Sequence, residues 1–399
     1  MRIGLFTDAY LPEISGVTLL VRRLRDELER LGHETYVYAP RYDRPSDDER
    51  RTFRFRAGPV FAYKTARMAV PYNREAARSY SMLDVIHSHT PFSLAYAALS
   101  AAHRHRTPHV QTYHTYLSQY RHYVPRALRP SVRAAESYSA FLCNRCTAVT
   151  VPTRSIEQEL LRFGVKRPIH VLPFGPDLRL YEEPPVWKVR TSLEIPEDAT
   201  LYLYAGRVAE EKNLRFLLRA FGRIHAAEPH SVLVLAGDGP SRVGLEDQAA
   251  SSGLANAVRF AGFLDQPQLK DVYREADLFL FASKTETQGL VLVEAMAGGT
   301  PAIAVDALGV RDVVCDGENG FLVAEDEDAF ARKALEIART PRLLEALRAG
   351  SRRTAIESSV QRSTERILEI YESCAAQAVL GRVRIRSRAA SIRRRRRLS

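Results

Sequence analysis

Two successive blocks of short apolar segments, separated by amphipathic helical segments, constrain the fold of this chain most strongly. Residues 3–6 read IGLF and predict a buried strand. Apolar residues then recur at spacings of three and four from Val17 to Leu31, the pattern of one helical face. Residues 35–38 are again strand-like. A strand, a helix and a strand in this order predict the βαβ unit of a parallel sheet.

The same alternation continues through both blocks. Further strands are predicted at 84–87, 109–112, 148–151, 170–172, 201–206, 231–237, 258–262, 277–283 and 301–305. The stretch from Phe174 to Pro196 is rich in proline and has little periodicity, which predicts a linker. We therefore expect an α/β protein with domains at 1–175 and 176–358, a helix at 359–380 that crosses back, and a polybasic tail at 381–399.

Positive charge is concentrated at the C-terminal end. The formal net charge is +11, but residues 382–399 contain nine arginines and no acidic residue, so the rest of the chain is nearly neutral. Near an anionic bilayer each such cation contributes about 1 kcal/mol of attraction. We expect the tail to be disordered or to lie on a membrane. Attachment to nucleic acid and a purely solubilising tail are the alternatives.

Several function classes are excluded by missing motifs. The chain has no G-x-x-x-x-G-K-[ST] phosphate loop. Gly237-Asp238-Gly239 continues as Pro-Ser-Arg, so it lacks the third glycine of the dinucleotide fingerprint. Asp326-Glu327-Asp328 matches the D-x-D of some metal-dependent sugar transferases, but it precedes a helical run, where acids favour a helix N-terminus. We expect neither a metal nor another cofactor, and no segment approaches the roughly 18 apolar residues of a membrane span.

Two cations mark the first chemical feature of the second block. Arg207 ends a predicted strand, and Lys212 follows five residues later. Ligands of parallel α/β sheets bind at the carboxyl ends of the strands. Two cations in one strand-to-helix turn there suit a diphosphate, although ordinary surface charges are the alternative.

Two carboxylates form the second feature. Glu286 and Glu294 lie eight residues apart after the predicted strand LFLFAS. Between them, Gly289, Leu290 and Val291 would supply backbone N–H groups at a helix N-terminus, which is a natural anion site. The carboxylates could then accept hydrogen bonds from polyol hydroxyls.

A glycine-containing turn is the third feature. Gly237 and Gly239 follow a predicted strand. Glycine allows close approach of the backbone to a ligand, and a simple tight turn is the alternative.

Taken together, these motifs resemble the retaining family-four glycosyltransferases of GT-B fold. The matching segments are PEISGV at 12–17, DVIHSHTPF at 84–92, QTYHT at 111–115, GRVAEEK at 206–212, AGDGP at 236–240 and ETQGLVLVEAMAGGTP at 286–301. The resemblance covers about residues 1–375, and the bacterial diacylglycerol hexosyltransferases look most similar. It implies two Rossmann-like parallel-sheet domains facing across a cleft, with a C-terminal helix crossing back to the N-terminal domain.

The resemblance also implies roles for individual residues. Arg207 and Lys212 would neutralise the diphosphate, Glu286 would bind the transferred sugar, and Glu294 would hold the ribose. His114 would lie against the donor sugar near the reacting centre. Backbone groups of the nucleotide-sugar site would come from Gly16, Gly237, Gly239, Gly289, Leu290 and Val291. Many relatives have Gly-Gly at 15–16 and an aromatic residue at 288, where this chain has Ser15-Gly16 and Gln288.

The first block also carries a segment of interleaved aromatic and basic residues. Such a segment suits an anionic bilayer surface, with an exposed basic helix as the alternative. The predicted acceptor and membrane residues are Tyr116, Tyr120, Arg121, Tyr123, Arg126, Arg129 and Arg133.

These features predict a retaining glycosyltransferase that moves an α-hexosyl group from a sugar nucleotide to a membrane lipid such as 1,2-diacylglycerol. UDP-glucose is the first donor expected and UDP-galactose the second. We expect a cytoplasmic protein held peripherally on the inner face of the cell membrane. The alternatives are a GDP-mannose-dependent phosphoinositide mannosyltransferase, a soluble polysaccharide or glycoside glycosyltransferase, and a nucleic-acid-binding protein that uses the arginine-rich tail.

Overall fold

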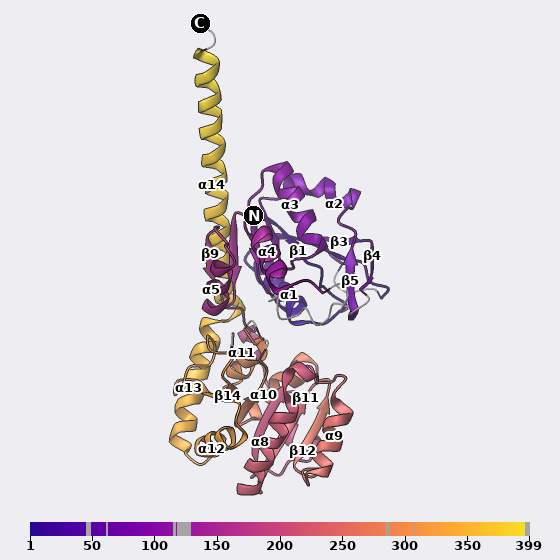
Figure 1. Ribbon diagram of the computed structural model, residues 1–399, viewed down its shortest axis with the longest axis vertical. Helices are drawn as coiled ribbons and strands as arrows, with labels where there is room; N and C mark the ends of the chain where they lie inside the picture. Colours follow the sequence, from indigo (N-terminus) through magenta and orange to yellow (C-terminus); the bar gives the residue numbers. More distant parts are fainter. Residues whose placement is uncertain are drawn as a thin grey trace. The chain divides into compact units, whose positions relative to one another are not determined.

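The chain forms two compact units, each built around its own parallel sheet (Figure 1). The computed structural model describes residues 1–44, 49–60, 63–114, 117, 129–284, 286, 288–307 and 309–395. Unit 1 contains Met1–Leu172 and Thr364–Ser399, and unit 2 contains Pro173–Ser363. The two-sheet α/β architecture predicted from the sequence is confirmed. The chain passes between the units at 172/173 and 363/364, whereas we predicted 175/176 and 358/359.

Unit 1 has a seven-stranded sheet in the order β3-β2-β1-β6-β7-β8-β9, with every neighbouring pair parallel. A separate antiparallel pair joins β4 to β5. The strands are β1 (Arg2–Phe6), β2 (Glu34–Pro40), β3 (Thr52–Phe55), β4 (Ala57–Val60), β5 (Tyr63–Ala69), β6 (Val85–Ser88), β7 (His109–Thr112), β8 (Ala148–Val151) and β9 (Ile169–Val171). The α-helices are α1 (Gly16–Arg30), α2 (Arg74–Ser79), α3 (Ser93–His105), α4 (Val132–Cys143) and α5 (Arg154–Arg162).

The first helix shows how the sequence pattern becomes structure. The Ser15 side chain accepts a hydrogen bond from the Thr18 backbone N–H, so it caps the N-terminus of α1. Four apolar residues of the predicted face, Leu20, Val21, Leu24 and Leu28, are buried, whereas Leu31 at the C-cap is exposed. The helix predicted from the periodicity is therefore confirmed.

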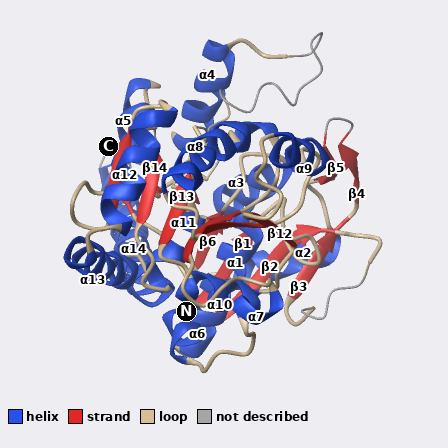
Figure 2. Cartoon of the chain, turned by 90° about the horizontal axis from the view of Figure 1, so that it is seen from below, coloured by secondary structure: helices blue, strands red, loops and turns tan. Residues whose placement is uncertain are grey.

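Unit 2 has a six-stranded parallel sheet in the order β12-β11-β10-β13-β14-β15. Its strands are β10 (Thr200–Ala205), β11 (Ser231–Ala236), β12 (Val258–Gly262), β13 (Leu278–Phe281), β14 (Ala302–Val305) and β15 (Gly320–Val323). Its α-helices are α6 (Leu178–Glu182), α7 (Val189–Ser192), α8 (Leu214–Ala227), α9 (Arg242–Ser251), α10 (Gln266–Glu275), α11 (Leu290–Ala297), α12 (Glu327–Ala338) and α13 (Pro341–Glu357). Every residue of β11 is buried, as expected for a strand covered on both faces. Figure 2 shows the helices in blue and the strands in red.

Three strands in unit 1 were not predicted. β3 lies at one end of the sheet, and β4 and β5 form the separate pair. Residues 53–56 read Phe-Arg-Phe-Arg, an apolar–polar alternation that is typical of a half-buried strand and was overlooked, whereas Gly58 and Pro59 break any alternation in β4. An edge strand or an isolated hairpin tolerates such residues because one side of it is not covered by a neighbouring strand.

The last helix, α14 (Val360–Arg395), is 36 residues long. It begins in unit 2 and belongs to unit 1 from Thr364 onward, so the predicted helix crossing back to the N-terminal domain is confirmed. The helix continues beyond residue 380, where we predicted its end, and includes most of the arginine-rich segment. In the part of the chain that the structure describes, no helix is long and apolar enough to cross a membrane.

Candidate active site

Arg207 and Lys212 lie in the turn that connects β10 to α8 in unit 2. Lys212 ends a 3-10 turn just before α8. Arg207 forms an ion pair with Glu211. Lys212 forms an ion pair with Glu286, which lies in the loop after β13. Since β10 and β13 are neighbouring parallel strands, their carboxyl ends bring these four side chains into one region.

The ion pair between Lys212 and Glu286 is largely shielded from water. The two side chains are 18% and 17% exposed, so their attraction is screened less than that of a surface pair. Ser283 Oγ donates to the same Glu286 Oε1 at 3.1 Å. Ser283 was not predicted as a site residue, although its hydroxyl group lies just after the carboxyl end of the buried strand β13, where ligands of parallel sheets bind.

Glu211 is a second residue of this region that was not predicted from the sequence. Burial raises the pKa of its carboxyl group, but hydrogen bonds from its own backbone N–H and from Arg207 outweigh burial and hold the pKa below the ordinary value. Glu211 is therefore ionised at neutral pH. A diphosphate bound to Arg207 would compete with this carboxylate for the guanidinium.

Glu294 lies on α11 and is buried. Tyr273 Oη donates a hydrogen bond to Glu294 Oε2 at 3.3 Å. Tyr273 comes from α10, which packs beside α11. The tyrosine therefore helps to fix the carboxylate that we predicted to hold the ribose.

The helix α11 begins directly after Gly289. Gly289 is the N-cap and has a φ of 73°, which favours glycine. Leu290 and Val291 form the first turn, where backbone N–H groups have no acceptor within the helix. The helix dipole adds partial positive charge at this end.

Gln288 joins this loop to the beginning of unit 2. Phe174 N–H donates to Gln288 Oε1 at 3.2 Å, and Gln288 Nε2 donates to the Phe174 carbonyl oxygen at 2.5 Å. Gln288 is only 3% exposed. The glutamine at the position where many relatives have an aromatic residue therefore makes a paired contact with the backbone just after the chain enters unit 2.

Gly237 and Gly239 are required by contacts between two neighbouring turns. A Cβ on Gly237 would lie 1.9 Å from the Gly206 carbonyl oxygen, and a Cβ on Gly239 would lie 2.3 Å from the Val208 carbonyl oxygen. Val208 N–H also donates to the Asp238 carbonyl oxygen at 2.9 Å. These two glycines thus allow the backbones of neighbouring turns to touch. This gives them a structural role, which was the alternative to binding a ligand.

The residues predicted in the first block lie in unit 1. Gly16 is the first residue of α1, directly after the cap Ser15. His114 follows β7, and its Nε2 lies 3.3 Å from Nδ1 of His89. Burial lowers the pKa of His114 to about 3, so this imidazole is neutral at physiological pH.

The predicted membrane residues are only partly covered by the structure. Tyr116, Tyr120, Arg121, Tyr123 and Arg126 lie outside the described residues. Arg129 and Arg133 are described, and both are exposed near the start of α4.

The possible D-x-D motif has a structural explanation. Asp326 is the N-cap of α12, and its side chain accepts a hydrogen bond from Ala329 N–H at 2.7 Å. Glu327 forms ion pairs with Arg219 and Arg223 of α8. In the described residues, no group of three or more histidine, cysteine or acidic side chains is arranged to hold a metal ion.

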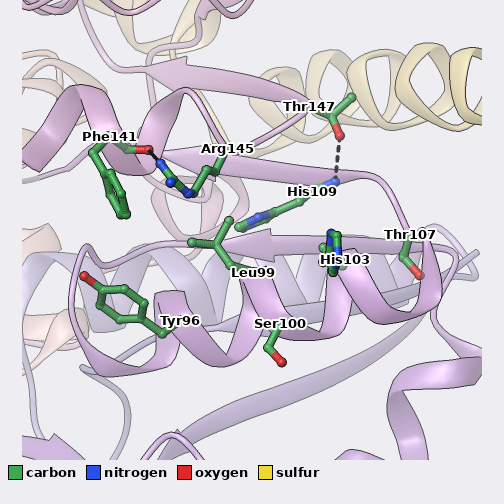
Figure 3. A pocket seen from close by; sticks show the side chains of 10 residues that line it. Tyr96, Leu99, Ser100, His103, Thr107, His109, Phe141, Arg145 and Thr147 are labelled. Atoms are coloured by element: carbon green, nitrogen blue, oxygen red, sulfur yellow. Dashed lines mark hydrogen bonds between the residues drawn. The ribbon is translucent and has the colours of Figure 1, made fainter.

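A cavity of about 510 Å³ lies in unit 1 between α3 and α4 (Figure 3). Tyr96, Leu99 and His103 of α3 and Phe141 of α4 are among its lining residues. Arg145 lies over the Phe141 ring, 3.5 Å from its centroid. None of the site residues predicted from the sequence lines this cavity.

Comparisons with known proteins agree with the two units. Residues 14–180 match the family described as Glycosyltransferase Family 4, and residues 185–354 match Glycosyl transferases group 1. The chain is 33% identical over 339 residues to an alpha-monoglucosyldiacylglycerol synthase of Streptococcus pneumoniae, covering 82% of this chain and 76% of that protein. It is 32% identical over 358 residues to the enzyme of the same name from Acholeplasma laidlawii, covering 86% and 90%.

Solved structures support the same architecture. A sucrose-phosphate synthase from Thermosynechococcus elongatus superposes with a TM-score of 0.77 at 22% identity, covering 94% of this chain and 99% of that one. At this identity the likeness shows the fold, which is GT-B.

Proposed function

Because this chain belongs to the glycosyltransferases that join a family 4 domain to a group 1 domain, we propose that it moves an α-glucosyl group from UDP-glucose to 1,2-diacylglycerol with retention of configuration. The names of the two relatives at 32–33% identity support glucose and diacylglycerol. UDP-galactose is the second donor to consider.

The observation that carries this proposal is the ion pair between Lys212 and Glu286 beside Arg207. It joins the carboxyl ends of two neighbouring parallel strands, where ligands of such sheets bind. The start of α11 follows Glu286 by four residues and adds N–H donors. The two cations and the N-terminus of α11 suit the diphosphate of a sugar nucleotide, and the Glu286 carboxylate suits the hydroxyl groups of the attached sugar.

The chemistry of the proposed reaction follows from these groups. Transfer breaks the bond between the anomeric carbon and the diphosphate oxygen and forms a bond to the acceptor oxygen. Negative charge develops on the leaving diphosphate oxygen, which takes up the proton of the acceptor hydroxyl. Fixed cations and N–H donors aimed at developing charge lower such a barrier. Lys212 can bind a phosphate oxygen and keep Glu286, because an ammonium has three donors.

Glu286 and Glu294 would recognise the two sugar rings of the donor. A carboxylate has about four lone-pair sites, so Glu286 can accept from a glucose hydroxyl while it holds Lys212. Glu294, fixed by Tyr273, would accept from the ribose hydroxyls. In this proposal the protein's own cations stabilise the leaving group, and we propose no resident metal.

We propose that the enzyme reaches its lipid acceptor by lying on an anionic membrane surface. The exposed arginines Arg129 and Arg133 near the start of α4 support this proposal, together with the nine arginines of residues 382–399. Each cation near an anionic bilayer contributes about 1 kcal/mol. The enzyme would then be a peripheral protein of the inner face of the cell membrane.

One incubation tests the proposed function. Purified protein is mixed with sugar-labelled UDP-glucose and vesicles of diacylglycerol and an anionic lipid, followed by organic extraction. We expect label in the organic phase, loss of this label in Lys212→Ala, and normal labelling in the control Lys333→Ala. Lys333 lies on α12 and pairs with Glu336.

The other outcomes separate the alternatives. Intact UDP-glucose and no lipid label would refute this donor, and parallel incubations with UDP-galactose and GDP-mannose would identify the one that is used. Release of UDP without lipid label would refute the membrane acceptor and leave transfer to a soluble acceptor.

A further inference from the structure

His89 and His114 in unit 1 face each other edge to edge. Nδ1 of His89 lies 3.3 Å from Nε2 of His114, the ring centroids are 5.5 Å apart, and the planes differ by 14°. The centroid separation is close to the nitrogen–nitrogen distance plus the two ring radii. Both nitrogens therefore lie near the line between the centroids, so the contact is an in-plane hydrogen bond rather than face-to-face stacking.

His89 is held rigidly on its other sides. Its backbone N–H donates to the Phe6 carbonyl oxygen at 2.9 Å, and its ring packs on the His87 ring with centroids 4.0 Å apart. His87 in turn contacts Tyr371 Oη at 2.5 Å and Thr112 Oγ1 at 2.6 Å. A side chain fixed this way can impose its geometry on His114.

Both imidazoles are neutral at physiological pH. Burial lowers the pKa of His89 well below its ordinary value, helped by His87 and His114, and burial lowers the pKa of His114 to about 3. Each ring therefore carries one proton, and only one of the two facing nitrogens can be the donor.

The remaining nitrogen of His89 decides between the two arrangements. Among the atoms of the described residues, Nε2 of His89 is buried and has no hydrogen-bond partner. A buried N–H without an acceptor is rarer in proteins than an acceptor without a donor. If the His89 proton were on Nε2, it would form a buried N–H group without an acceptor. The proton therefore lies on Nδ1, which faces His114.

We propose that His89 is the positioning residue of His114: His89 donates from Nδ1 to Nε2 of His114 and so fixes the His114 proton on Nδ1. The role of His114 beside the donor sugar rests on the proposed function. The hydrogen bond and the tautomer rest on the geometry of unit 1.

This tautomer limits what His114 can do. Its Nε2 is already an acceptor for His89, and its Nδ1 is a donor. A group bound at Nδ1 must therefore accept a hydrogen bond, as a sugar hydroxyl oxygen or a carbonyl oxygen does. His114 consequently orients the donor sugar rather than removing a proton from the acceptor hydroxyl.

Two substitutions of equal size test the proposal. Asparagine places an amide N–H near the position of histidine Nδ1, whereas aspartate places only acceptor oxygens there. We expect ¹⁵N NMR of histidine-labelled full-length protein to show Nδ1–H for His114 in the wild type and in His89→Asn. In His89→Asp we expect Nε2–H. The His114 signal is assigned by its loss in His114→Gln.

Activity gives the second readout. We expect kcat for lipid glucosylation to be nearly unchanged in His89→Asn and to fall about 100-fold in His89→Asp, as misorientation near a reacting centre does. The control His109→Gln removes another buried imidazole of the same sheet, one that contacts Ser88 and Cys146, and should keep the wild-type tautomer of His114.

The two arms separate this inference from the proposed function. A wild-type His114 protonated at Nε2, or the same tautomer in both His89 variants, would overturn the role of His89. Absence of transfer by the wild type with the expected NMR tautomers would refute the proposed function and leave the role of His89 intact.

Discussion

Tyr371 Oη and His87 Nδ1 are 2.5 Å apart, although 284 residues separate them in the chain. Both residues are fully buried. Tyr371 lies on α14 and His87 on β6, so this hydrogen bond attaches the returning C-terminal helix to the central sheet of unit 1. It also supports the imidazole on which His89 packs.

Loss of this contact should destabilise unit 1. We expect Tyr371→Phe to lower the free energy of unfolding in urea by about 1–3 kcal/mol, because a nitrogen of His87 is left buried without its partner. Tyr36→Phe is the control, since Tyr36 Oη bonds Glu34 at the surface, and should cost at most about 0.5 kcal/mol. Equal effects of the two substitutions would show that the buried contact contributes nothing specific.

Glu286 should contribute to transfer more than to nucleotide binding. Glu286→Gln keeps the shape of the side chain but removes its charge. We expect kcat/KM for UDP-glucose to fall about 10- to 100-fold, because a hydrogen bond to a charged group contributes about 1.5–3 kcal/mol. The affinity for UDP alone, measured by calorimetry, should stay nearly constant because Lys212 and Arg207 remain. Glu336→Gln on α12 is the control. A parallel loss of UDP affinity would contradict a role at the sugar.

Gly237 lies where the turn after β11 touches the turn after β10, so we expect a larger side chain at this position to destabilise the protein. Gly237→Ala should cost about 3 kcal/mol or more, since its Cβ would overlap the Gly206 carbonyl oxygen. Gly253→Ala separates the backbone component, because Gly253 also has a positive φ but open space around it, and should cost about 1–2 kcal/mol. Thermal unfolding of both variants measures the difference, and similar values would refute the overlap.

Buried neutral histidines predict loss of stability in acid. Burial lowers the pKa of His109 to about 3, from an ordinary value of 6.5. The unfolded chain therefore binds a proton that the folded chain does not between these two values. Above pH 6.5 the His109 ring is neutral in both states, so it does not alter the free energy of unfolding. Below pH 6.5 the free energy of unfolding decreases by about 1.4 kcal/mol per pH unit, until the folded protein also binds the proton near pH 3.

A substitution isolates the contribution of His109. His109→Gln keeps a polar group near the position of Nε2, which contacts Ser88 Oγ at 2.7 Å, but it cannot bind the proton. We expect a shallower decrease of unfolding free energy from pH 6.5 to 4 in this variant than in the wild type. An identical slope would show that His109 does not titrate on unfolding.

The arginine-rich segment should set the affinity for anionic vesicles. We expect deletion of residues 382–399 to weaken sedimentation with vesicles that contain an anionic lipid, because nine cations are removed. Replacement of the five arginines at 393–397 by lysine keeps the charge and should keep most of the binding. Retention on DNA but not on vesicles at the same salt concentration would instead support nucleic-acid binding.

Much of the fold follows from local pattern alone. The periodicity from Val17 to Leu31 predicts α1, and the apolar run at 231–236 predicts β11, because burial on one helical face or on both faces of a strand leaves a mark in the order of residues. The same logic places Arg207 and Lys212 in one strand-to-helix turn. The edge strand β3 was missed although Phe53, Arg54, Phe55 and Arg56 alternate between apolar and polar side chains, which is the period of a strand.

The partners of the site residues are set by tertiary structure. The sequence singled out Glu294 but not Tyr273, because these two residues come from different helices, α11 and α10. The contact of Gln288 with Phe174 and the facing rings of His89 and His114 are of the same kind. Ser283 is a different case, since it lies three residues before Glu286 in the same loop and was within reach of the sequence. Periodicity and motif spacing describe neighbours along the chain, whereas hydrogen-bond partners depend on how the sheet and helices pack, so only the folded chain determines them.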